Sequence, residues 1–110
     1  MQFSFANVGT ASTTVTVTIA GVPQGSYPLT ANQSMQVKYA GQNSGPVQIS
    51  SSGGVPIISS ENVTYTPDAG VTYTSFAEML GLPAGQLTSS YVFPWYNSVN
   101  LNTEIRFGAP

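Results

Sequence analysis

The side chains that most often carry out catalysis are scarce in this sequence. It has no histidine and no cysteine, and its ionisable side chains are two basic and four acidic ones. A serine or threonine nucleophile needs a neighbouring base, and the single lysine, Lys38, falls on the polar side of an alternating pattern. The ionisable residues are Lys38, Arg106, Glu61, Asp68, Glu78 and Glu104. This set predicts that the protein is not an enzyme.

Each of these charged residues has a structural explanation. Glycoside cleavage needs a pair of carboxylates, but Asp68 has the context of a turn and Glu78 that of a helix cap. Zinc sites need His or Cys, and calcium sites need clustered carboxylates. A Lys–Asn isopeptide crosslink would require Lys38 to be buried beside an asparagine and an acid. We therefore expect no catalytic residue, no metal and no cofactor.

Charge is scarce over the whole chain. Only 5% of the residues are charged, whereas globular domains usually carry about 25%. Ser, Thr, Asn and Gln supply 40 of the 110 residues. A net charge of −2 leaves no basic surface for nucleic acid, and no apolar run reaches the ~18 residues of a membrane span. The low charge also leaves little repulsion between copies of the chain.

Apolar and polar residues alternate along most of the chain, as they do in half-buried strands. In residues 13–20, Val15, Val17 and Ile19 fall on one side and threonines on the other. Pro28 cannot donate a backbone hydrogen bond, so its short strand is expected at a sheet edge. Turn signals separate about seven such strands. The pattern predicts an all-β fold, an immunoglobulin-like sandwich of two sheets.

One segment departs from this alternation. Ser75 followed by Glu78 has the spacing of a helix-capping box, and Gly81 is a typical C-terminal stop. The spacing predicts one short helix near residues 75–81, whose apolar face would close one end of the sheet stack. That face comprises Phe76, Met79 and Leu80.

The two ends of the chain resemble each other. Residues 104–110 can be laid on residues 2–8, at an offset of 102, so that polar, apolar and small residues coincide in order. The identical residue is Phe107, which falls on Phe5. Two amphipathic strands can match by chance, but the match also fits one period of a repeat. Residues 99–110 would then be a linking or donor strand, equivalent to the first strand of a next unit.

A sandwich of residues 1–98 has one slot for such a first strand. If the N-terminal strand with Phe3 and Phe5 fills it, the C-terminal strand must extend the domain's own edge or add to a neighbour. Addition to a neighbour is a heterologous contact, which grows into a filament when it does not close. The predicted linking strand comprises Asn102, Thr103, Glu104, Ile105, Arg106 and Phe107.

Several blocks of sequence occur here in an order that resembles a known repeat. The most specific are SFAEMLGLPA at residues 75–84, YVFPWYN at 91–97 and NTEIRFG at 102–108. Together they resemble an uncharacterised β-rich repeat found in tandem in large secreted or surface proteins of bacteria. The resemblance implies an extracellular or cell-surface location and supplies no catalytic residue. It also implies that the segment after Trp95-Tyr96-Asn97 leads into the first strand of the next repeat.

Aromatic residues near the C-terminal end allow a second class of function. Tyr91, Trp95 and Tyr96 would form either a stacking platform for sugars or part of a subunit interface, where aromatic residues are enriched. Asn32 and Asn62 each begin an acceptor pattern for N-glycosylation. The sequence favours a structural subunit or repeat of an extracellular filament, sheath or surface layer, which binds copies of itself by strand addition. A carbohydrate-binding or adhesive module is the alternative.

Overall fold

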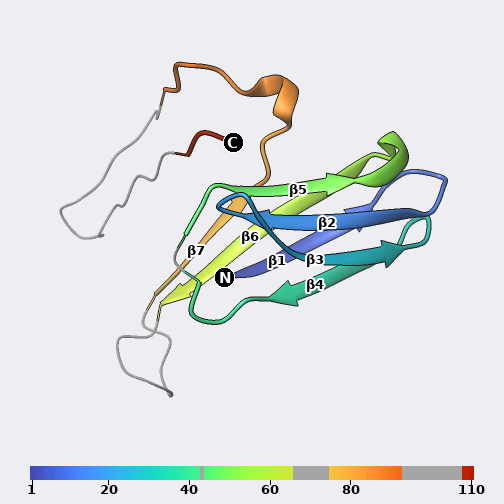
Figure 1. Cartoon of the computed structure of the whole chain (residues 1–110), viewed down its shortest axis with the longest axis horizontal. Helices are drawn as coiled ribbons and strands as arrows, with labels where there is room; N and C mark the ends of the chain where they lie inside the picture. Colours follow the sequence, from blue (N-terminus) through green and yellow to red (C-terminus); the bar gives the residue numbers. More distant parts are fainter. Residues whose placement is uncertain (43, 66–74, 93–107) are drawn as a thin grey trace.

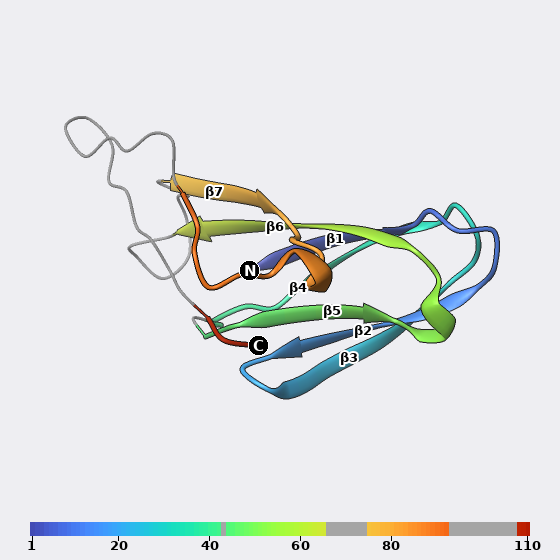
Figure 2. The same ribbon diagram turned by 90° about the horizontal axis from the view of Figure 1, so that it is seen from above.

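The computed structural model describes residues 1–42, 44–65, 75–92 and 108–110. Seven strands form two antiparallel sheets that lie face to face (Figures 1 and 2). Within the described ranges, helical structure consists of two short 3₁₀ segments, η1 (Ser52–Gly54) and η2 (Ala84–Gln86). The strands are β1 (Gln2–Asn7), β2 (Thr13–Ile19), β3 (Val22–Leu29), β4 (Ser34–Lys38), β5 (Val47–Ser51), β6 (Ile57–Tyr65) and β7 (Ser75–Leu80). The predicted all-β fold of two sheets is confirmed.

The strand order determines which strands have open edges. The four-stranded sheet has the order β4-β1-β6-β7, and the three-stranded sheet has the order β3-β2-β5. The N-terminal strand β1 is therefore an inner strand, paired with β4 on one side and with β6 on the other. The predicted edge position of the Pro28 strand is confirmed, because β3 is an outer strand. Among the residues that the structure describes, the outer strands of the two sheets are β4, β7, β3 and β5.

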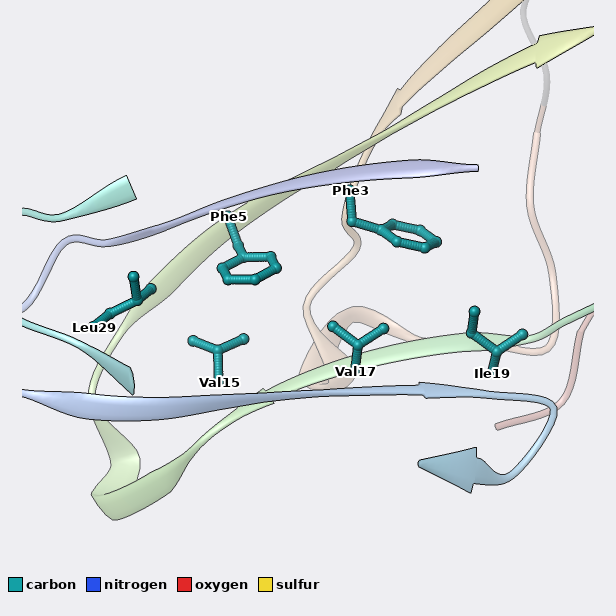
Figure 3. Close-up of a cluster of buried hydrophobic side chains, with 6 residues drawn as sticks. All are labelled: Phe3, Phe5, Val15, Val17, Ile19 and Leu29. Atoms are coloured by element: carbon teal, nitrogen blue, oxygen red, sulfur yellow. The ribbon is translucent and has the colours of Figure 1, made fainter. Parts of the chain in front are cut away.

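The hydrophobic core lies between the two sheets, where side chains of β1 face those of β2 (Figure 3). Alternate residues of both strands point inward, so the alternation in the sequence is an alternation between core and outer face. The core side chains, each at most 2% exposed, are Phe3, Phe5, Val15, Val17, Ile19 and Leu29. Full burial of one such side chain stabilises a fold by about 1.5–3 kcal/mol. The N-terminal strand thus supplies the two largest side chains of the core.

A two-residue turn joins the central strand β2 to the outer strand β3. Ile19 pairs with Val22, and the intervening Ala20 and Gly21 both have positive φ, at 50° and 77°. Two positive φ angles define the type I′ turn, whose twist matches that of the flanking strands. The turn therefore fixes the register of this hairpin.

The predicted helix near residues 75–81 is wrong, because these residues form strand β7. β7 pairs antiparallel with β6, from Ser60 opposite Leu80 to Tyr65 opposite Ser75. A helix of two turns is marginal in water, whereas pairing along β6 continues an existing sheet. Glu78 is consequently not a capping residue, since it lies opposite Asn62 of β6.

The apolar face expected for that helix is also wrong. Successive side chains of a strand point to opposite faces, so Met79 and Leu80 lie on different sides of the sheet. Met79 is 63% exposed and Leu80 is 82% exposed. These residues do not close an end of the sheet stack.

Candidate assembly interface

The first-strand slot of the sandwich is occupied by β1 itself. Phe3 and Phe5, the two residues predicted to mark this strand, are 1% and 2% exposed. Their rings also contact Tyr39 and Tyr27, with centroids 5.9 and 5.7 Å apart. Because β1 has a paired strand on each side and a sheet across the core, this slot has no room for a second strand.

A buried amide fastens the end of β1. The Asn7 side chain donates from Nδ2 to the carbonyl oxygens of Ala11 and Thr30, at 2.8 and 3.1 Å. Its Oδ1 accepts a hydrogen bond from the Gly9 backbone N–H at 2.9 Å. Asn7 is 1% exposed, so these bonds replace water for a buried polar group. Ala109 stands at the matching position of the C-terminal segment and has no such group.

The two chain ends lie at the same end of the sandwich. The Met1 amino group donates to the Tyr39 carbonyl oxygen at 3.0 Å, beside the start of β1. Near the C-terminus, a Cβ placed on Gly108 would lie 2.8 Å from the Pro46 Cβ, just before β5. Figures 1 and 2 show the N and C labels at similar positions along the long axis. The first residue of the chain and residues 108–110 therefore lie near the same end of the two sheets.

Most of the exposed large apolar side chains gather on β7 and the residues after it. Together with the neighbouring Ile58, we call these side chains the β7 surface. Its members, which are between 47% and 88% exposed, are Ile58, Met79, Leu80, Leu82, Leu87, Tyr91 and Val92. Glu78 is the single charged residue in 75–92. These side chains lie on both faces of β7 and along the residues after it, and this amount of uncovered apolar surface is typical of an interaction site. The sequence did not predict this exposed surface, because the predicted helix would have buried Phe76, Met79 and Leu80 at one end of the sandwich.

The other residues predicted to form a linking or sugar-binding site are described only in part. Tyr91 is 48% exposed, and its hydroxyl oxygen accepts a hydrogen bond from the Thr88 backbone N–H at 3.0 Å. Trp95, Tyr96 and the linking strand of residues 102–107 lie outside the described residues. The structure therefore shows one ring of the predicted sugar platform.

The two predicted glycosylation acceptors differ in their surroundings. Asn32 is exposed in the turn before β4, with a φ of 60°. Asn62 is half-buried on β6 and lies opposite Gln2 of β1, on the face directed away from the core. An oligosaccharide would meet fewer neighbours at Asn32.

The charged residues form no group typical of catalysis in the part of the chain that the structure describes. Lys38 is exposed on β4, so it lacks the burial that an isopeptide crosslink requires. The described ranges contain no group of three or more potential metal ligands. They also contain no helix long and apolar enough to cross a membrane.

Two tyrosines join the sheets along one side of the core. The hydroxyl oxygens of Tyr27, on β3, and Tyr39, just after β4, are 2.7 Å apart. Burial and the hydrogen bond with Tyr27 raise the pKa of Tyr39 to about 12. The Tyr39 hydroxyl therefore remains neutral near pH 7, and the pair acts as a structural contact between β3 and the end of β4.

Comparisons with protein-family models, curated proteins and solved structures give no match to this chain. The resemblance to a tandem repeat of bacterial surface proteins therefore stays a prediction.

Proposed function

We propose that the protein is a structural subunit or repeat of an extracellular filament, sheath or surface layer, in which copies join head to tail by β-strand addition. The observation that carries the proposal is the match between residues 104–110 and the first strand. β1 alternates between core and outer face and supplies Phe3 and Phe5 to the core. A second segment with the same pattern is expected to need a sheet of its own.

The place that such a segment would occupy is limited by β1. Because β1 is paired on both sides, the C-terminal segment has to extend an open edge or join another copy. Gly108, just after the linking segment, lies beside Pro46, at the end of the sandwich where β1 begins. This position favours a junction in which one copy supplies a strand to the next.

The composition supports association between like copies. A surface with 5% charged residues gives little electrostatic repulsion at close approach. Open sheet edges present unpaired backbone groups, which are templates for strand pairing. A neutral polar surface with open edges therefore favours pairing with another copy of the chain.

Negative-stain electron microscopy of the purified chain tests this proposal. We expect filaments or extended oligomers from the intact chain, and monomers from a variant that lacks residues 103–110. Ile105→Asp should also abolish assembly. The control Asn102→Asp places the same charge on the polar side of the alternating pattern and should leave assembly intact. Unchanged assemblies after the deletion, with the truncated chain still folded by circular dichroism, would refute strand addition.

A carbohydrate-binding or adhesive module is the second candidate, because the Tyr91 ring is exposed while its hydroxyl is held by Thr88. A fixed, exposed ring is suited to stacking on a sugar. Glycan-array binding that Trp95→Ala abolishes, in a chain that remains monomeric, would favour this function over assembly.

A further inference from the structure

The four outer strands of the two sheets differ in their capacity to accept another strand. β3 contains Pro23 and Pro28, and neither proline can donate a backbone hydrogen bond to a neighbouring strand. Its pairing with β2 is also irregular, with a register shift between Val17 and Thr18. The prolines and the irregular register therefore make β3 a poor edge for the addition of another strand.

The β5 edge is short and polar. Pro46, which precedes this five-residue strand, cannot donate a backbone hydrogen bond. The exposed side chains of β5 are Gln48 and Ser50, whereas Val47 and Ile49 are half-buried. A strand added at this edge would gain few apolar contacts.

The β4 edge offers little exposed apolar surface. Its exposed residues are Ser34, Gln36 and Lys38, whereas Met35 and Val37 are half-buried against the core. A strand added at this edge would therefore meet mainly polar side chains.

The β7 edge has none of these obstacles. β7 has six residues without proline, and within the described part of the chain it pairs with β6 alone. Met79 and Leu80 expose apolar surface on both of its faces. Glu78, its one charged residue, is an acid. This edge offers backbone pairing, apolar contacts and a negative charge together.

We propose that β7 is the edge that accepts the linking strand of a second copy, in antiparallel register with Arg106 opposite Glu78. This inference rests on the proposed function. In that register Ile105 lies opposite Met79 and Phe107 lies opposite Ala77, so apolar residues meet on one face. On the other face Arg106 lies opposite Glu78, and Glu104 lies opposite Leu80. Antiparallel pairing matches every other pair of strands in the structure.

Displacement of β1 is the competing arrangement, and Asn7 argues against it. A C-terminal segment inserted in the β1 slot would place Ala109 where Asn7 holds Gly9, Ala11 and Thr30. The buried Gly9 N–H and the carbonyl oxygens of Ala11 and Thr30 would lose these hydrogen bonds. The linking strand is therefore a poorer occupant of this slot than β1.

Cysteine crosslinking tests the acceptor edge without background, because the chain has no native cysteine. Residues directly opposite in antiparallel strands have Cβ atoms about 4.5–5.5 Å apart, near the range a disulfide spans. Met79→Cys and Ile105→Cys proteins, mixed under mild oxidation, should give mainly the mixed dimer. The double variant should give a ladder of covalent oligomers. Val37→Cys mixed with Ile105→Cys is the matched control for the β4 edge, because Val37 and Met79 lie on the same face of the sheet.

The outcomes of this experiment distinguish a failure of the β7 assignment from a failure of the proposed strand addition. A ladder through Met79 supports β7 as the acceptor. Crosslinking through Val37 instead, or filaments with no crosslink at Met79, overturns the β7 assignment and leaves strand addition intact. A covalently closed monomer from the double variant shows that the strand folds back on its own β7. That result overturns the assignment to a second copy, and monomers that never assemble overturn the proposed function itself.

A charge exchange tests the register with little change to the fold, since Glu78 is exposed. Glu78→Arg and Arg106→Glu alone should each raise the concentration needed for assembly by about fivefold. The double exchange should restore the original value. Two additive losses, with no recovery in the double variant, would overturn the Arg106–Glu78 pairing.

Discussion

Asn7 is the buried polar residue on which the end of β1 depends. Its amide connects β1 with the loops after β1 and β3 through bonds to Gly9, Ala11 and Thr30. Asn7→Ala would leave the buried Gly9 N–H without this acceptor and would remove the partly buried bonds to Ala11 and Thr30, so we expect the free energy of unfolding to fall by about 1–3 kcal/mol. Urea denaturation measures this loss. Gln48→Ala, at an exposed position, should cost less than about 0.5 kcal/mol, and equal losses in the two variants would contradict the role of Asn7.

The tyrosine pair predicts a specific pH dependence. The folded state raises the pKa of Tyr39 from 10.0 to about 12, so it favours the neutral hydroxyl. This stabilisation is complete below pH 10 and is lost as the pH rises from about 10 to about 12. Tyr39→Phe should therefore lose less stability over that interval than the parent chain, although it is less stable at pH 7 by about 1 kcal/mol.

Chemical denaturation at several alkaline pH values measures this difference. Tyr91→Phe is the matched control, since it removes a tyrosine outside the pair. Parallel stability curves for the parent and Tyr39→Phe would show that the pair does not contribute.

Among the elements, β7 is where the sequence and the structure disagree, and a substitution can discriminate between strand and helix. Ala77 is exposed on β7. Ala77→Val replaces a good helix former by a good strand former, so in a strand it should stabilise the chain by up to about 1 kcal/mol. In a helix it would destabilise by about 0.5 kcal/mol. Thermal unfolding measures the sign, and a lower midpoint for the variant would contradict the strand.

The sequence predicted the elements whose pattern is set by the core. Val15, Val17 and Ile19 alternate because one side of β2 is buried, and Pro28 marks an edge because it lacks an N–H. The segment at residues 75–81 was not predictable in this way. Its capping spacing is a local signal, whereas its structure depends on the open edge of β6, which local sequence does not encode.

The candidate site was predictable to a different degree. The match between the two ends could be read from the sequence, but the inner position of β1 required the sheet order. The β7 surface also required the structure. Met79 and Leu80 look like core residues in a helix, and become exposed only on an outer strand.

At the scale of the whole molecule, low charge predicts association that depends little on salt. With a net charge of −2, long-range repulsion is small, and one exposed ion pair contributes at most about 1 kcal/mol. The concentration needed for assembly should change by less than about fivefold between low and high ionic strength. Light scattering at a series of salt concentrations measures it. A much steeper dependence would show that charge, and not strand pairing, governs association.

Head-to-tail addition of a strand differs from a closed dimer in how the assembly grows. Sedimentation velocity of the intact chain over a range of concentrations measures this difference most directly. The account predicts a continuous series of species that lengthens with concentration and collapses to monomer when residues 103–110 are removed. A single monomeric species at every concentration would contradict it.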